Sequence, residues 1–119
     1  MRGTFRILST ALSTLALIGA IGISATASAD ALEDGKKLAY DKKKGNCLAC
    51  HMIVGGKQAG NIAPPLIAMK ARFPDKATLR AQINDPRAKN PDSMMPPFGP
   101  HGVLSAKEID LITDFIHSL

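Results

Sequence analysis

The apolar positions near the C-terminal end of the chain are spaced as on one face of a helix. They recur at intervals of three or four residues, the period of an amphipathic helix, and comprise Ile109, Ile112, Phe115, Ile116 and Leu119. Just before them, Ser105 is followed three residues later by Glu108, the pattern of a capping box. Leu104 can pack against Ile109 as a hydrophobic staple. The pattern predicts a final helix with a sharply defined start.

Weaker helical patterns lie upstream of this segment. They predict helices over residues 32–43, 65–72 and 76–84. Gly45 and Asn46 would stop the first, Asp75 would cap the third and Pro86 would end it. No run alternates between apolar and polar residues, so no strand is expected. The pattern therefore predicts an all-α fold.

The strongest chemical signal is the run Cys47-Leu48-Ala49-Cys50-His51, which holds both cysteines of the chain. This spacing is the attachment signature of a c-type haem. Thiols three residues apart share one face of a helical turn, where both can bond to the vinyl groups of a porphyrin. The imidazole of His51 can then ligate the iron. We expect one haem c, bound covalently.

Residues 1–29 are interpreted as a secretory signal peptide. Arg2 and Arg6 form a basic start, an apolar stretch follows, and Ala-Ser-Ala directly precedes Asp30, as at a cleavage site. The apolar stretch is shorter than the roughly 20 residues that span a bilayer, which disfavours an uncleaved anchor. Haem c is attached outside the bacterial cytoplasm, so we expect residues 30–119 to form one periplasmic cytochrome domain with no membrane span.

The mature domain is small and contains few large side chains to fill a core. The chain has no tryptophan, and aromatic residues make up 4% of it. Small domains bury a low fraction of their surface and often need a metal or a covalent staple. A buried porphyrin would supply the missing apolar mass, so the fold should depend on its cofactor.

The charge balance is too mild to indicate nucleic-acid binding. The formal charge of +5 falls by two when Arg2 and Arg6 leave with the signal peptide, and arginines are not clustered. One dense cluster, Lys42-Lys43-Lys44, directly precedes the haem motif. It is interpreted either as a solvated helix end, favoured by the helix dipole, or as a docking patch for an acidic redox partner.

The iron needs a ligand opposite His51, and the mature chain offers six candidates. They are Met52, Met69, Met94, Met95, His101 and His117. Met52 adjoins His51 and cannot cross the ring. Met69 shares a helical face with Leu66, which indicates core packing. His117 falls in the last helical turn, where a histidine often complements only the dipole.

Met94 and Met95 lie in the proline-rich loop of residues 85–102. Pro96 restricts Met95 to an extended backbone, and neighbouring side chains of an extended segment point to opposite sides. Only one methionine can then face the iron. We favour Met95, with Met94 packing at the haem rim, and keep His101 as the outside alternative. A thioether ligand raises the reduction potential and suits an electron acceptor.

Pro64 lies 13 residues after His51. Its carbonyl could accept a hydrogen bond from the second ring nitrogen of His51, which would orient the imidazole and tune its basicity. A plain loop proline is the equally supported alternative.

Three segments resemble class I cytochromes c, and within them the SoxX family, the small monohaem subunits of SoxAX cytochromes. They are residues 45–51 (GNCLACH), 60–66 (GNIAPPL) and 90–99 (NPDSMMPPFG). The first is general to c-type cytochromes, whereas the other two carry the narrower resemblance. It spans nearly the whole mature chain, although some family members have a longer segment between the histidine and the methionine.

The resemblance implies a class I cytochrome c fold, in which the first and last helices pack together, here with Phe115 near Gly35. It implies that Cys47 and Cys50 hold the haem, that His51 and Met95 ligate iron and that Pro64 holds His51.

The resemblance also implies three partners: a SoxA-like monohaem or dihaem cytochrome forming a heterodimer, a SoxYZ-like carrier reached through that complex, and a small cytochrome c acceptor. The complex would be an L-cysteine S-thiosulfotransferase with its active site on the SoxA-like subunit. This chain has no third cysteine, so it would be the non-catalytic electron relay. Two alternatives differ in function: a free-standing periplasmic electron carrier, and a haem enzyme or gas sensor with an open sixth position, against which Met95 argues.

Overall fold

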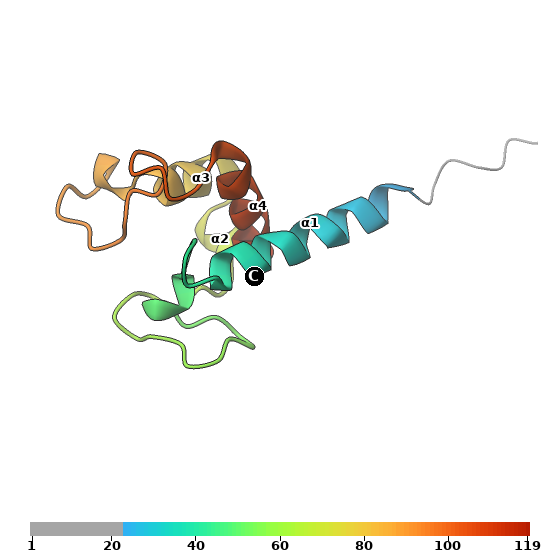
Figure 1. The fold of residues 1–119 in the computed structure, drawn as a ribbon, viewed down its shortest axis with the longest axis horizontal. Coiled ribbons are helices and arrows are strands. Elements are labelled where there is room, and N and C mark those ends of the chain that lie inside the picture. Colours follow the sequence, from blue (N-terminus) through green and yellow to red (C-terminus); the bar gives the residue numbers. More distant parts are fainter. Residues whose placement is uncertain (1–22) are drawn as a thin grey trace, which may run out of the picture.

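The structure, a computed structural model, describes residues 23–119 (Figure 1). Its elements in chain order are α1 (Ile23–Tyr40), the 3-10 turn η1 (Cys47–Ala49), α2 (Met69–Arg72), α3 (Lys76–Asn84), the 3-10 turn η2 (Pro86–Ala88) and α4 (Ala106–His117). No strand occurs among the described residues. The all-α fold expected from the sequence is confirmed.

The long helices α1 and α4 cross at a point where their backbones nearly touch (Figure 1). Gly35 lies at the crossing, and a Cβ atom there would overlap the carbonyl of Leu111 and come within 3.0 Å of the Phe115 Cβ. The ring of Phe115 meets that of Tyr40 edge to face, with centroids 5.9 Å apart. The expected packing of the first helix on the last, with Phe115 near Gly35, is confirmed.

The apolar face of α4 forms the centre of the core. Ile109, Ile112, Phe115 and Ile116 are all buried, as the helical spacing predicts. The capping box is also present: the Ser105 hydroxyl accepts from the Glu108 amide, and the Glu108 carboxylate accepts from the Ser105 amide. The predicted start of this helix is confirmed.

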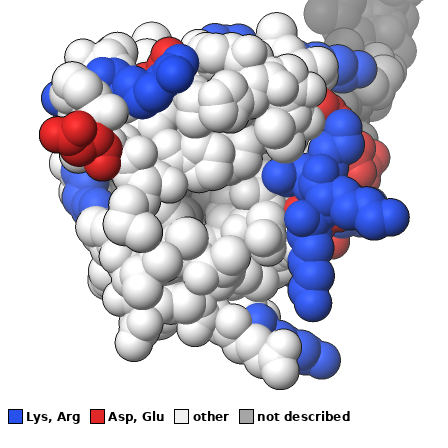
Figure 2. Space-filling view, turned by 60° about the vertical axis from the view of Figure 1, so that its left-hand side comes forward, with Lys and Arg blue, Asp and Glu red and all other residues white. Residues whose placement is uncertain are grey.

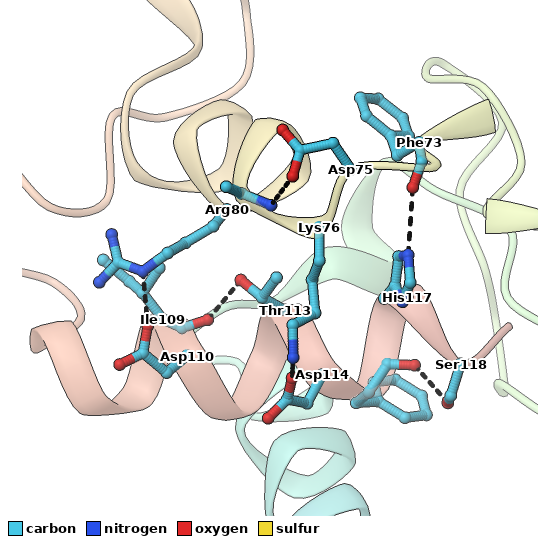
Figure 3. A network of polar contacts seen from close by, with 12 residues as sticks. Phe73, Asp75, Lys76, Arg80, Ile109, Asp110, Thr113, Asp114, His117 and Ser118 are labelled. Carbon is cyan, nitrogen blue, oxygen red and sulfur yellow. Dashed lines mark hydrogen bonds and ion pairs between the residues drawn. The ribbon is translucent and has the colours of Figure 1, made fainter. Parts of the chain in front are cut away.

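Polar contacts fix α3 and the loop before it against α4 (Figure 3). Lys76 and Arg80 of α3 pair with Asp114 and Asp110 of α4, at 2.6 and 2.5 Å. His117 Nε2 lies 3.1 Å from the Phe73 carbonyl. A carbonyl can only accept, so His117 donates from Nε2 and joins the helix end to the loop before α3.

The helix predicted over residues 32–43 is shifted towards the N-terminus: α1 spans Ile23–Tyr40. The chain leaves the helix because the Asp41 carboxylate accepts from the Lys43 amide and the Asp41 carbonyl from the Asn46 amide, forming a turn. Most of the expected signal peptide, residues 1–22, lies outside the described residues. Within residues 23–119, no helix is long and apolar enough to cross a membrane.

The helix predicted over residues 65–72 is shorter, since α2 covers only Met69–Arg72. Pro65 lacks an amide proton, and the Leu66 amide bonds instead to the Met52 carbonyl at 2.9 Å. Ala68 then takes a left-handed conformation with φ of 51°, which no helix can contain. A contact distant in sequence therefore overrides the local helical pattern.

Candidate haem site

The motif residues lie on a tight turn that starts immediately after α1. Asn46 adopts a left-handed conformation with φ of 46°, and the amide of His51 bonds to the Cys47 carbonyl at 2.9 Å. This turn directs Cys47, Cys50 and His51 to the wall of one cavity. The structure thus brings together the three residues that the motif singles out.

The His51 ring is held by the segment on which Pro64 lies. Its Nδ1 is 2.6 Å from the Pro64 carbonyl oxygen, while the Ala63 amide bonds to the Cys50 carbonyl at 3.1 Å. Because the carbonyl can only accept, Nδ1 carries the proton and the Nε2 lone pair is left free for a metal. Of the two interpretations left open for Pro64, the structure has the one with a contact to His51.

A second contact supports this segment from the other side. The Arg72 guanidinium donates to the Pro65 carbonyl at 2.7 Å and lies 3.4 Å from the Met69 sulfur. Met69 is 1% exposed, which fits the core role expected for it. The residue next to Pro64 is therefore tied to α2, so its carbonyl is held in place against His51.

The two methionines of the proline-rich loop face different surroundings. Met95 is half-buried and lines both compartments of the cavity, and its amide bonds to the Ser93 hydroxyl at 3.2 Å. Met94 is 86% exposed and reaches only the rim of the outer compartment. His101 is exposed and lies on the wall of neither compartment. Met95 thus has the setting expected of a sixth ligand, while iron ligation itself stays a prediction.

The cavity consists of two compartments that share Gly45, Cys47, His51, Met95 and Phe98 on their walls. Their volumes are about 190 Å³ for the inner and 340 Å³ for the outer one. Inner-wall residues are mostly apolar, with His51, Arg72 and Gln82 as polar exceptions. The outer compartment opens to the surface beside the lysine cluster, as the hollow in Figure 2 shows.

These walls fit a covalently held porphyrin. Burial raises the pKa of the Cys47 thiol to about 11, so its sulfur sits in surroundings that suit an uncharged thioether. No group of three or more metal-binding side chains of the histidine, cysteine or carboxylate type occurs in residues 23–119. The mostly apolar inner wall would suit a haem, and His51 and Met95 on that wall would be the candidate ligands to its iron.

Arg72 and Gln82 line the cavity but were not among the site residues predicted from the sequence. Both reach the cavity only because α2 and α3 pack beside it, and neither belongs to a local motif. The spacing of Arg72 three residues after Met69, on the same helical face, is the one local signal that could have indicated it.

Comparisons with known proteins agree with this geometry. The family model "Cytochrome c" matches residues 32–119. The crystal structure of SoxXA from P. pantotrophus is similar with a TM-score of 0.65 and 26% identity, over 72% of this chain and 79% of that chain. An "uncharacterized lipoprotein" of Aquifex aeolicus (strain VF5) is 37% identical over 79 residues, which are 63% of this chain. The matched part spans only 37% of that relative's length.

Proposed function

Because this chain belongs to the cytochrome c family, whose members carry covalently bound haem c and transfer electrons, we propose that it is the electron-relay subunit of a SoxAX-type complex. The observation that carries the proposal is the similarity to SoxXA, which extends over 79% of the matched chain. Residues 60–66 and 90–99, which resemble the corresponding segments of the SoxX family, support the same assignment.

The proposed roles of the site residues follow from their positions. Cys47 and Cys50 would hold one haem c through thioether bonds, and His51 Nε2 and the Met95 sulfur would be the ligands that the protein supplies to its iron. Pro64 keeps the imidazole oriented through the 2.6 Å contact. Haem c, once bound, supplies reversible one-electron chemistry.

The chain relays electrons and does not perform the sulfur chemistry. In the proposed reaction a sulfur–sulfur bond forms between thiosulfate and a cysteine thiol of a SoxYZ-type carrier. The thiol proton is released, and the electron pair leaves through the SoxA-like subunit. This chain takes those electrons singly and passes them to a small cytochrome c. Both of its cysteines are used for haem attachment, so no thiol is left to accept sulfur.

We also propose that residues 1–29 direct export and are removed, which leaves residues 30–119 as a periplasmic domain. The Ala-Ser-Ala sequence before Asp30 supports this processing. The N-terminal sequence of the purified protein tests it, because the mature chain should begin at Asp30.

Covalent attachment is tested by denaturation. Haem should stay with the chain in acid acetone, and replacing both Cys47 and Cys50 with serine should give a protein that retains no haem and folds poorly. A double variant that is folded and free of haem would contradict the cofactor-dependent core.

The relay role is tested by reconstitution. The oxidised chain should stay oxidised with thiosulfate alone and become reduced when a SoxA-like cytochrome and a SoxYZ-like carrier are added. Reduction by thiosulfate without any partner would overturn the proposal. Failure to co-elute with the SoxA-like cytochrome in gel filtration would favour the free-standing carrier instead.

A further inference from the structure

The proline-rich loop brings two adjacent methionines to one cavity but turns only one of them inward. Met95 is half-buried and lines both compartments, whereas Met94 is 86% exposed and still lies on the wall of the outer one. Their side chains are identical, so chemistry alone does not decide which thioether could ligate iron. The decision depends on the backbone that joins the two residues.

Pro96 restricts this backbone only in part. A proline limits the backbone angles of the residue before it, which here is Met95. It leaves the φ and ψ angles of Met94 free. Because neighbouring side chains of an extended segment point to opposite sides, rotation about these two bonds exchanges the methionine that faces the cavity. A further contact must therefore hold Met94 in its present conformation.

That contact is a hydrogen bond to Ser93. The Met95 amide donates to the Ser93 hydroxyl oxygen at 3.2 Å, a turn in which a serine side chain binds the amide two residues later. The ring that this bond closes contains the φ and ψ bonds of Met94. The two prolines that follow have no amide proton, and of the amides in residues 94–98 only that of Met95 bonds to another described residue.

Ser93 is itself fixed from the side of the core. Its amide bonds to the Asn90 carbonyl at 3.0 Å, and the Asn90 amide bonds to the Pro86 carbonyl at 3.1 Å. Pro86 is buried at the start of η2. The Ser93 hydroxyl is therefore presented to the Met95 amide from an anchored turn.

We propose that Ser93 is a positioning residue that selects Met95, and not Met94, as the sixth ligand of the haem iron. The inference rests on the proposed ligation by Met95. Ser93 lies on the wall of neither compartment, so it acts through the Met95 backbone. Without its hydroxyl, Met94 can turn inward from the wall of the outer compartment while Met95 turns away.

The first experiment follows the sulfur-to-iron charge-transfer band of the oxidised, haem-loaded chain. Met95→Ala alone should lose the band. Ser93→Ala combined with Met95→Ala should regain a sulfur–iron band, because Met94 is then free to turn inward. Adding Met94→Ala to this pair should remove the band again. A merely structural role for Ser93 would not return the band to a chain that lacks Met95.

The second experiment measures how firmly Met95 is held, by titrating the oxidised protein with imidazole, which competes for the sixth position. Met94→Ala is present throughout, so that no second thioether replaces Met95. Ser93→Ala should raise the apparent affinity for imidazole about fivefold, the factor that one neutral hydrogen bond contributes. Ser93→Thr keeps the hydroxyl and should restore the original affinity.

Ser118→Ala is the matched control for the titration. Its hydroxyl also makes one hydrogen bond, to the Phe115 carbonyl at 2.6 Å, but Ser118 lies on the wall of neither compartment and distant in sequence from the methionines. The variant should bind imidazole as the parent does. A fivefold rise for this control as well would show that any loss of stability weakens ligation, and would overturn the role of Ser93.

The remaining outcomes separate this proposal from those on which it rests. No band in Ser93→Ala combined with Met95→Ala, or an imidazole affinity that Ser93→Ala leaves unchanged, would overturn the selection by Ser93 while Met95 remains the ligand. A parent protein without a sulfur–iron band would refute ligation by Met95 and this proposal with it. No partner protein takes part in either measurement, so failure of the SoxAX-type role would not alter the result.

Discussion

Gly35 is the position at which one added carbon should disturb the fold most. It is buried on α1 where this helix crosses α4, and a Cβ atom there would overlap the Leu111 carbonyl. The second contact, with the Phe115 Cβ, is at 3.0 Å. A carbonyl belongs to the helix backbone and cannot rotate away, so Gly35→Ala must move the two helices apart.

Two opposing effects decide whether Gly35→Ala stabilises or destabilises the protein. Alanine is favoured over glycine in a helix by about 1 kcal/mol. Overpacking a core typically costs about 1–3 kcal/mol, and the clash here is with backbone, so the upper part of that range applies. Gly35→Ala should therefore destabilise the protein by about 1–2 kcal/mol, which lowers the melting temperature of a domain of this size by roughly 5–15 °C.

Thermal unfolding of the haem-loaded variant, followed by circular dichroism, measures this loss. Lys37→Ala, at an exposed position of the same helix, is the control and should stay within about 0.5 kcal/mol of the parent. A melting temperature for Gly35→Ala equal to or above that of the parent would show that helix propensity outweighs the clash, and that the two helices are packed less tightly than described.

Three further predictions concern the core, the iron and pH. Phe115→Ala should lower the free energy of unfolding by about 3–5 kcal/mol. Asp114→Ala, which removes only an exposed ion pair, should lower it by about 1 kcal/mol or less in the same thermal unfolding measurements. Equal losses would contradict the assignment of Phe115 to the buried face of α4 and of Asp114 to its polar face. Met95→Ala should abolish the weak sulfur-to-iron charge-transfer band of the oxidised protein and Met94→Ala should leave it; the reverse would refute the argument from the proline-restricted backbone. Hydrogen bonds from Lys44 and the Ser105 amide lower the pKa of Glu108 from its usual 4.5. The ionised Glu108 therefore contributes fully to stability above pH 4.5, and this contribution is lost as the pH falls through the lower pKa of the folded state. Glu108→Gln should flatten this part of the dependence of stability on pH, and an unchanged dependence would mean that the contact does not form in solution.

The elements that could be predicted are those whose start is encoded within one helical turn. Asp75 accepts from the amides of Ala77 and Thr78, and α3 spans Lys76–Asn84 as expected. α4 likewise follows its capping box. The prediction of a helix over residues 65–72 was wrong in its first half, because the Leu66 amide bonds to the Met52 carbonyl. Nothing local in the sequence encodes that pairing.

The residues of the candidate site also form two groups, those encoded locally in the sequence and those brought to the cavity by packing. Cys47, Cys50 and His51 form one contiguous motif, and the restriction that Pro96 imposes on Met95 is local too, so both could be read from the sequence. Arg72 and Gln82 reach the cavity through the packing of separate helices. Such residues become visible only when the relative positions of the helices are known.

The haem turn is also tied to the helix crossing. Gly45 is buried against the last turn of α1: its amide bonds to the Leu38 carbonyl at 3.1 Å, and a Cβ there would lie 3.0 Å from that oxygen and 3.3 Å from the Cys47 sulfur. Lys44, one residue earlier, pairs with Glu108 at the start of α4. α1 therefore holds Gly45 and α4 holds Lys44, the two residues that lead towards the motif. Because a packed core transmits small displacements, separation of α1 from α4 at Gly35 should reach the Cys47 sulfur without any change to a residue of the site.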